Sequence, residues 1–452
     1  MTEDDDAFEL NEAEFIGDYG RKFQEGVETK ALLIGMYAHS KDLPICEEHL
    51  SELNELSNTF GVETVGKMAC SLKKIDASTY LHQGKLEEVL EAIHQKKANL
   101  VIFDEEITPA QQRNLEKLLK VPVMDRTELI LEIFAQRAHT KEAQLQVELA
   151  KAKYQFPRLK RMWSHFSRQR ASGGYLRGEG EKQIEIDRRL LRKQVDKLRE
   201  EIREVERYRN VQRTSRIRSG MPTFAIIGYT NAGKSTLLNA MTAADVLVED
   251  KLFATLDPTT RKFTLPNNQE ILLTDTVGFI RKLPHTLVAA FKSTLEAAVH
   301  DDILLHLIDV SHPLAEEHAA TTYEILKELK ADERSVINVL NKVDKCEDLK
   351  MVYRLKLRYP KTVVISALAH TGFDELMEMM MTALKERRQL MKLKIPQSAY
   401  ALVTQLRREG NVLSEEYEEN DVLLAVEVPL ESVHRYLSYS DAEALPTKVN
   451  LE

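Results

Sequence analysis

Short apolar runs alternate with helical patterns through residues 28–127. The runs ALLIGMY and LVIFD have the length and composition of buried strands. The stretches KLEEVLEAIHQ and AQQRNLEKLLK carry apolar residues at the spacing of an amphipathic helix. Strands that alternate with helices in this way predict a small α/β domain at residues 28–127, after an acidic tail at residues 1–27.

The next part of the chain has two helical patterns with a break between them. The first ends at Pro157, which cannot continue a helix. Its apolar positions are Ala138, Leu145, Leu149, Ala152 and Phe156; those of the second are Ile184, Leu191, Val195, Leu198, Ile202 and Val205. Two helices with matching apolar seams predict a long antiparallel helical hairpin within residues 128–219. Two independent helices packed on the flanking domains are the alternative.

The end of the chain has a different pattern. After KLKIP, the stretch ALVTQLRR predicts a helix and NVLSEEY and DVLLAVEVP predict strands, followed by ESVHRYL. We expect a small α+β domain at residues 389–452, without a recognisable catalytic constellation. Residues 220–388 are left as a further domain, and its apolar strands end in chemically distinctive loops.

Residues 224–235 read FAIIGYTNAGKS, an apolar strand that opens into a phosphate-binding loop. Gly228 and Gly233 let the backbone turn its N–H groups toward an anion. Lys234 places a charge near the β- and γ-phosphates, and the Ser235 hydroxyl is placed for Mg²⁺. The helix predicted to follow, STLLNAM, directs the positive end of its dipole at the same phosphates.

Three further motifs follow in order. ILLTDTVG, residues 271–278, ends with Asp275, placed to hold Mg²⁺ through a water, and with Gly278, whose N–H can meet a γ-phosphate. After the apolar run SVINVL, Asp344 can accept hydrogen bonds from guanine N1–H and the exocyclic amine, donors that adenine lacks. The order of these motifs, completed by VVISAL at residues 363–368, predicts an α/β P-loop GTPase domain that binds GTP.

Length and composition indicate the number of domains and the cellular compartment. The chain has 452 residues, enough for about three domains. Its cysteines, Cys46, Cys70 and Cys346, fit no metal-binding spacing and suit a reducing cytosol, so we expect a cytoplasmic protein. The acidic N-terminus is no signal peptide, and no apolar run is long enough to span a bilayer, so we expect no stable membrane insertion.

The charge is unevenly distributed. Residues 158–218 contain 19 Lys and Arg against 9 Asp and Glu, which leaves −19 for the rest of a chain with a net charge of −9. Such a concentrated basic stretch indicates a polyanionic partner. A solvated helix surface rich in ion pairs is the alternative.

The segment between the two helical patterns, residues 157–181, is long for a loop. It interleaves aromatic residues, arginines and glycines: Trp163, Phe166, Arg168, Arg170, Gly173, Gly174, Tyr175, Arg177, Gly178 and Gly180. Such side chains can stack on unpaired bases and neutralise phosphates. A loop folded back on the protein is equally compatible with this pattern.

Several long stretches resemble the HflX family of GTPases: residues 125–159, 171–189, 228–242 and 252–261. One departure is Glu179, since the family's loop usually reads RGPGE. The resemblance implies a GTPase that binds the large (50S) ribosomal subunit and its RNA, with the hairpin facing the ribosome. It also implies roles in ribosome splitting, rescue or biogenesis. We expect a monomer in the free state.

The motifs and the resemblance together predict the nucleotide contacts. They are Gly228, Tyr229, Thr230, Asn231, Ala232, Gly233, Lys234, Ser235, Thr236, Phe253, Ala254, Thr255, Leu256, Asp257, Asp275, Thr276, Val277, Gly278, Asn341, Lys342, Val343, Asp344, Ser366, Ala367 and Leu368. Ser235 and Thr255 are the expected Mg²⁺ ligands, Thr255 by resemblance, with Thr259 and Thr260 as alternatives.

The predicted reaction is Mg²⁺-dependent hydrolysis of GTP by water, used as a conformational switch, with Lys234, Asp275 and Gly278 as the catalytic residues. Phe279 occupies the position where many relatives of Ras carry a water-orienting Gln, and a phenyl ring cannot orient water by hydrogen bonding. Two other classes were weighed. A GTPase of RNA maturation lacks support from a reactive Cys or His cluster, and a membrane-associated regulatory GTPase lacks a basic amphipathic helix with a large apolar face.

Overall fold

The computed structural model describes residues 28–158, 177–218, 221–242, 252–284, 302–331, 334–346, 349–418 and 420–440. These residues form two compact units. The first contains the described residues up to Gln136 together with Ala150–Val195, and the second contains Arg137–Leu149 and the chain from Asp196 onward. No helix in this described part of the chain is apolar over enough residues to cross a bilayer.

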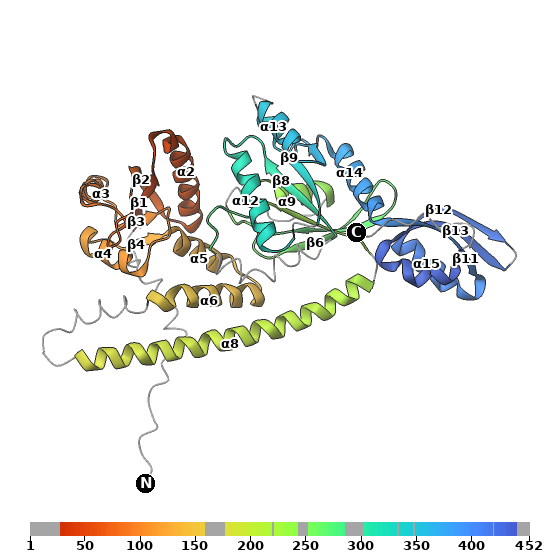
Figure 1. Ribbon diagram of the computed structural model, residues 1–452, viewed down its shortest axis with the longest axis horizontal. Coiled ribbons are helices and arrows are strands. Elements are labelled where there is room, and N and C mark those ends of the chain that lie inside the picture. The colour runs from red at the N-terminus through yellow and green to blue at the C-terminus, as the bar shows by residue number, and fades with distance from the viewer. Residues whose placement is uncertain are drawn as a thin grey trace, which may run out of the picture. The chain divides into compact units, whose positions relative to one another are not determined.

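The first unit is built on a parallel sheet of four strands in the order β2-β1-β3-β4 (Figure 1). The strands are β1 (Lys30–Tyr37), β2 (Glu63–Ser71), β3 (Leu100–Phe103) and β4 (Val123–Asp125). The helices are α2 (Leu43–Phe60), α3 (Gln83–Lys96), α4 (Pro109–Leu119) and α5 (Arg126–Arg137), with a 3-10 turn at Ser40–Asp42. The predicted α/β class is confirmed, because strands and helices alternate throughout.

Helices cover both faces of this sheet. Val89 and Leu115, from α3 and α4, pack with Ile34 and Phe103 on one face. On the other face, α2 approaches β1 so closely that a Cβ at Gly35 would lie 2.9 Å from the Cys46 sulfur and from Leu50. The apolar strand runs of the sequence therefore belong to a sheet buried on both sides, as parallel sheets are.

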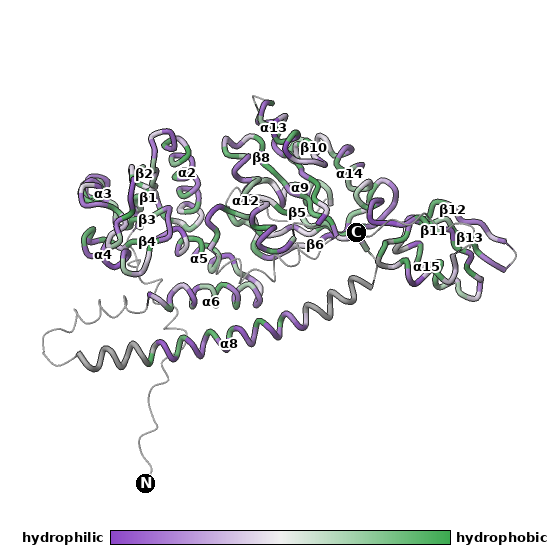
Figure 2. The backbone as a smooth tube through the Cα atoms, viewed as in Figure 1, coloured by the Kyte–Doolittle hydropathy of each residue, from purple (hydrophilic) through white to green (hydrophobic). Residues whose placement is uncertain are grey.

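The two predicted helices of the middle region are α6 (Lys141–Gln155), extended by a 3-10 turn at Phe156–Arg158, and α8 (Arg177–Arg218). Ala152 and Leu191 are buried against each other, with Phe156 and Val195 alongside, so these helices pack together rather than independently. Figure 2 shows the described part of α8 as mostly hydrophilic with separated hydrophobic positions, the pattern expected of such a seam.

Two predicted boundaries differ from the structure. The helix α8 begins at Arg177 and includes Gly178 and Gly180, which the pattern had placed in the connecting loop. The range 128–219 also starts inside α5, a separate helix that ends at Arg137. The rest of the loop, from residue 159 to Tyr175 and including Trp163, lies outside the described residues, as does the acidic tail at 1–27.

The second unit holds a six-stranded sheet in the order β10-β9-β8-β5-β7-β6. The strands are β5 (Thr223–Gly228), β6 (Thr259–Thr264), β7 (Glu270–Asp275), β8 (Ile303–Asp309), β9 (Ser335–Asn341) and β10 (Thr362–Val364). Only β6 runs antiparallel to its neighbour among these described strands. The helices are α9 (Lys234–Thr242), α12 (Ala315–Glu328), α13 (Lys350–Arg358) and α14 (Phe373–Glu386), with a 3-10 turn at Val343–Lys345.

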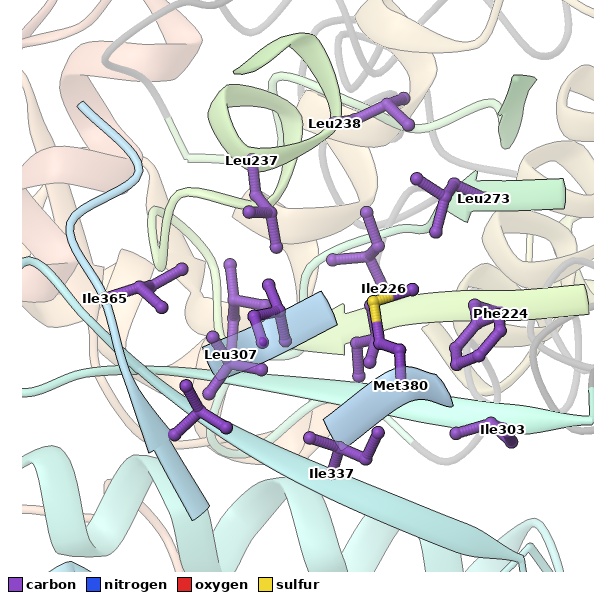
Figure 3. Close-up of a cluster of buried hydrophobic side chains, with 14 of the residues drawn as sticks. Phe224, Ile226, Leu237, Leu238, Leu273, Ile303, Leu307, Ile337, Ile365 and Met380 are labelled. Atoms are coloured by element: carbon purple, nitrogen blue, oxygen red, sulfur yellow. The ribbon is translucent and has the colours of Figure 1, made fainter. Parts of the chain in front are cut away.

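The main core of this unit lies under α9 and α14. Figure 3 shows Ile226 and Leu307 of the central strands clustered with Leu237 of α9 and Met380 of α14. The opposite face is covered by α12 and α13, whose buried residues pack on Ile308 and Leu340. The helices thus sandwich the sheet and leave the ends of its strands accessible.

The strand order locates the site. From β5 the chain goes to one side for β6 and β7 and to the other for β8, β9 and β10. A crevice forms at the carboxyl end of the strand where the order reverses, and ligands of open α/β sheets bind in such a crevice. Gly228 is the last residue of β5, so the phosphate loop lies at this position.

The C-terminal residues of the second unit form an antiparallel sheet in the order β11-β13-β12. Its elements are β11 (Arg388–Pro396), α15 (Tyr400–Glu409), β12 (Asn411–Glu418), β13 (Asp421–Pro429) and α16 (Val433–Tyr436), with 3-10 turns at Gln397–Ala399, Leu430–Ser432 and Leu437–Tyr439. Val403 and Leu406 of α15 pack on the sheet. This arrangement matches the predicted α+β pattern.

Candidate functional site

A cavity of about 350 Å³ lies where the predicted motifs meet, within the range typical of ligand pockets. Its lining consists of Thr230, Asn231, Gly233, Lys234, Ser235, Thr236, Phe253, Ala254, Thr255, Gly278, Asn341, Lys342, Asp344, Lys345, Ala367 and Leu368. The sequence predicted all of these residues except Lys345. The sequence signal for Lys345 was its position directly after the Asn-Lys-Val-Asp motif.

The phosphate loop requires both of its glycines. Gly228 has φ +148°, and a Cβ there would lie 2.4 Å from the Leu307 carbonyl oxygen. Gly233 has φ +95°, and a Cβ there would lie 2.4 Å from the Asn341 amide nitrogen. Because α9 begins at Lys234, directly after the loop, its N-terminal N–H groups lie at the cavity, where an anion is stabilised.

Lys234 is buried at the base of the cavity. Its Nζ donates to the Tyr229 carbonyl over 2.9 Å and to the Gly228 carbonyl over 3.4 Å. Burial lowers the pKa of Lys234 to about 8, which the nearby Asp275 carboxylate partly opposes. The phosphates of a nucleotide would favour the charged ammonium further, so the lysine is suited to hold a polyphosphate.

Two hydroxyls converge on one buried carboxylate. The Ser235 Oγ donates to Asp275 Oδ2 over 2.7 Å, the Thr255 Oγ1 donates to the same oxygen over 3.2 Å, and the two hydroxyl oxygens are 2.9 Å apart. Burial raises the pKa of Asp275, while Lys234 and the two hydroxyls lower it. Asp275 Oδ1 is buried and has no hydrogen-bond partner among the described residues.

This oxygen cluster fits Mg²⁺. The ion is commonly held by one or two protein oxygen ligands, by waters and by substrate phosphates rather than by a cage of carboxylates. No group of three or more acidic, His or Cys side chains suited to a metal occurs in the described parts of the chain. Thr259 and Thr260 lie in β6 instead, where the Thr260 hydroxyl is 3.1 Å from that of Thr274.

The segment after Asp275 is fixed by buried contacts. Thr276 Oγ1 donates to the Ile226 carbonyl over 2.7 Å. Gly278 is packed so tightly that a Cβ would lie 2.8 Å from a Thr230 methyl carbon and 3.0 Å from Lys234 Nζ. The Phe279 side chain is 1% exposed, so its ring is inside the protein and not in the cavity.

Asn341 ties the two ends of the cavity together. Its Nδ2 donates to the Ala232 carbonyl over 2.8 Å, and its Oδ1 accepts from the Ala367 N–H over 2.9 Å. Lys342 forms an ion pair of 2.7 Å with Asp309. Asp344 and Leu368 are exposed at this end, which leaves a carboxylate accessible to a base.

The remaining predicted contacts lie outside the cavity lining. They are Gly228, Tyr229, Ala232, Leu256, Asp257, Asp275, Thr276, Val277, Val343 and Ser366. Asp275 nevertheless contacts the two hydroxyls. Tyr229 stacks on His318, with ring centroids 3.7 Å apart, and its hydroxyl accepts from the Arg281 N–H. Asp275 and Tyr229, whose carbonyl accepts from Lys234 Nζ, therefore support the lining rather than form it.

Three family models match consecutive parts of the chain. They are GTP-binding GTPase N-terminal over residues 47–135, GTP-binding GTPase Middle Region over 137–216, and 50S ribosome-binding GTPase over 223–342. A GTPase HflX of Chlamydia pneumoniae is 50% identical over 418 residues, which cover 92% of this chain and 88% of that protein. The chain belongs to the HflX family of GTPases.

Other HflX proteins match over similar lengths. The Caldanaerobacter subterraneus GTPase HflX is 42% identical, covering 94% of this chain and 96% of that protein. The Escherichia coli GTPase HflX is 42% identical, covering 79% and 82%. A solved structure of SsGBP with GDP aligns at 26% identity over 79% of this chain and 98% of that one, with a TM-score of 0.45. As an HflX member the chain is a GTP hydrolase, and the predicted family and P-loop GTPase fold are confirmed.

Proposed function

We propose that this HflX GTPase requires Mg²⁺, binds the large ribosomal subunit through its basic helical hairpin, and acts in ribosome splitting, rescue or biogenesis. The observation that carries the proposal is the match of residues 223–342 to a family described as a 50S ribosome-binding GTPase. The cavity proposed to bind the nucleotide is lined by residues within this matched range and by two later loops, one with Asp344 and Lys345 and one with Ala367 and Leu368.

In the proposed mechanism, this chain binds and orients the phosphates and stabilises the charge of the transferring phosphoryl group. Lys234 and the N–H groups of the phosphate loop neutralise charge on the β- and γ-phosphates, and the Gly278 N–H meets the γ-phosphate. Mg²⁺, when held by the Ser235 and Thr255 hydroxyls and through a water by Asp275, supplies positive charge at those phosphates.

Guanine selectivity would come from the exposed end of the cavity. Asp344 accepts from guanine N1–H and from its exocyclic amine, and a backbone N–H near Ala367 reaches the guanine oxygen. Asn341 supports both loops, because it bonds to Ala232 on the phosphate loop and to Ala367 on the base loop. The selectivity therefore depends on one carboxylate, that of Asp344, at the end of a cavity whose loops Asn341 joins.

The hairpin supplies the surface for a polyanion. On the described part of α8, Arg189, Arg192, Lys193 and Lys197 are exposed, while Leu191 and Leu198 are buried. These cations outnumber Asp196 and Glu200, the exposed acids of the same stretch, and such an excess suits a phosphate backbone, whose neutralisation dominates affinity for nucleic acids. We place this function in the cytoplasm and the free protein in the monomeric state.

Cosedimentation tests the proposal directly. The full-length protein is centrifuged with purified 50S subunits, with 30S subunits, with protein-free precursor RNA and with anionic liposomes, each with a non-hydrolysable GTP analogue or with GDP. We expect pelleting with 50S subunits and the analogue, weakened by salt. Pelleting with liposomes alone would favour a membrane-associated GTPase. Binding to protein-free precursor RNA but not to subunits would favour RNA maturation, and either result contradicts the proposal.

A further inference from the structure

Asp257, two residues before β6, is held by a residue from much earlier in the chain. The Asp257 carboxylate accepts from the Thr140 hydroxyl over 2.5 Å and from the Thr140 N–H over 3.2 Å. These residues are 117 positions apart, and both belong to the second compact unit. Asp257 was predicted to contact the nucleotide, but the structure places its carboxylate on Thr140.

Thr140 is itself ordered by the helix that it precedes. Its Oγ1 accepts from the Ala143 N–H over 3.2 Å, and its carbonyl accepts from the Gln144 N–H over 3.0 Å, so Thr140 caps α6. The hydroxyl accepts one hydrogen bond from α6 and donates its own hydrogen to Asp257. The carboxylate also lies at the N-terminus of α6, where the helix dipole favours a negative charge.

The segment that carries Asp257 has a backbone that must be held. Phe253 has φ +56°, a left-handed conformation that a bulky residue seldom adopts. Burial of Leu252 and Phe253 anchors the start of this segment, and burial of Leu256 anchors its end beside Asp257. Thr255 lies between these anchors.

We propose that Thr140 is a positioning residue for the GTPase site: it holds Asp257 and thereby keeps the Thr255 hydroxyl beside Ser235 and Asp275. The contact orders the Thr255 hydroxyl before Mg²⁺ binds. It comes from the N-terminal cap of α6 rather than from any GTP motif. The inference rests on the proposed role of Thr255 as a Mg²⁺ ligand.

The test compares Thr140→Val, which keeps the shape but removes the hydroxyl, with Thr140→Ser, which keeps the hydroxyl. In full-length protein, GTP turnover is measured against Mg²⁺ concentration at fixed GTP, and GDP affinity is measured without Mg²⁺. We expect Thr140→Val to raise the Mg²⁺ concentration for half-maximal rate about three- to tenfold, less than the full effect of a hydrogen bond lost to a charged group because only part of that loss reaches the metal site. Thr140→Ser should stay within about twofold of the parent, and GDP affinity should not change.

A second pair of variants separates this inference from the proposed metal site. Thr255→Val should raise the Mg²⁺ requirement at least as much as Thr140→Val. If Thr255→Val leaves the requirement unchanged, the proposed metal site is wrong and the inference with it. If Thr255→Val raises it and Thr140→Val does not, only the inference is wrong.

Asp257→Asn provides an independent route should Thr140→Val fold poorly. We expect the same rise in the Mg²⁺ requirement, and adding Thr140→Val to Asp257→Asn should add little, since both remove one interaction. Additive effects, or loss of thermal stability with an unchanged Mg²⁺ requirement, would show a merely structural contact and overturn the proposal.

Discussion

The Thr230 N–H donates to the Phe279 carbonyl over 2.7 Å, so the phosphate loop and the segment after Asp-Thr-Val-Gly are joined through their backbones. The Phe279 N–H donates to the Gly228 carbonyl over 3.0 Å, and Tyr229 and Phe279 form an isolated parallel β-bridge. With its backbone paired and its ring buried, Phe279 offers no hydrogen-bonding group to an attacking water. A water-orienting group has to come from elsewhere.

Asp344→Asn should shift nucleotide preference from GTP toward xanthosine triphosphate. The amide presents an N–H to the additional carbonyl of xanthine and loses the acceptor that the guanine donors require. Competition binding of the two triphosphates, for the parent and the variant, measures the shift.

Lys345→Ala is the matched control, because Lys345 also lines the cavity but has no acceptor for guanine. It should keep the preference for guanine. An unchanged preference in Asp344→Asn would refute the assignment of Asp344 to the base.

The GTP motifs could be predicted because each one is local. Gly228, Lys234 and Asp344 lie at or within a few residues of the carboxyl ends of predicted strands. Their spacing from those strands therefore places them at the same edge of the sheet. The strands were also predictable from local sequence. A strand of a parallel sheet is covered on both faces, so it appears as a continuous apolar run, such as the one that ends at Gly228.

Features that depend on distant partners could not be predicted. Nothing near Asp257 in the sequence indicates that its carboxylate bonds to Thr140, and nothing in the Gly178–Gly180 pair shows that α8 continues through it. Local propensity treats glycine as a weak helix former, so the sequence pattern placed this pair in the connecting loop. Thr255 was favoured over Thr259 and Thr260 by the family resemblance alone; nothing local in the sequence showed that its hydroxyl contacts Asp275 while β6 begins at Thr259.

Acid should destabilise the GTPase domain through His306. Its Nδ1 is 3.1 Å from Asn338 Oδ1, an acceptor that also receives the Tyr323 hydroxyl, so Nδ1 carries the hydrogen and Nε2 does not. Nε2 is buried without a partner among the described residues. Burial lowers the pKa of His306 to about 4 from its ordinary value of 6.5, against a smaller opposing effect of Asn338.

Between pH 6.5 and about 4 the unfolded chain therefore binds a proton at His306 that the folded chain does not. The free energy of unfolding should fall as the pH falls through this window, by up to about 1.4 kcal/mol per pH unit from this group, and not change further from it below pH 4. His306→Gln can keep a donor to Asn338 without titrating, so its thermal unfolding should depend less on pH between 7 and 5. Parallel pH profiles of the two proteins would show that His306 does not contribute.

Removal of the segment before α8 should separate nucleotide binding from ribosome binding. We expect replacement of residues 160–176 by a short Gly/Ser bridge to leave GTP and GDP affinity intact and to abolish binding to 50S subunits. The reason is that this stretch contains Trp163, Phe166 and Arg168 beside a basic helix, whereas the cavity is built from residues after 229.

The control replaces Trp163 and Phe166 by Leu and keeps every arginine. Its 50S binding should weaken without being lost if stacking and charge both contribute. Cosedimentation and subunit-splitting assays of the deletion variant that match the parent would mean that residues 160–176 are not needed to contact the ribosome.

Because Phe279 supplies no water-orienting group, we expect the large subunit to activate GTP hydrolysis, and multiple-turnover hydrolysis with and without 50S subunits tests this most directly. Because Phe279 cannot orient water, free protein should turn over on the order of 10⁻⁴–10⁻² s⁻¹, as unassisted GTPases do. A group supplied by the subunit, or ordered by it, is typically worth about 10³–10⁵ in rate, so 50S subunits should raise turnover steeply while 30S subunits do not. Rapid turnover of free protein, with an increase of less than about twofold on addition of 50S subunits, would contradict the account.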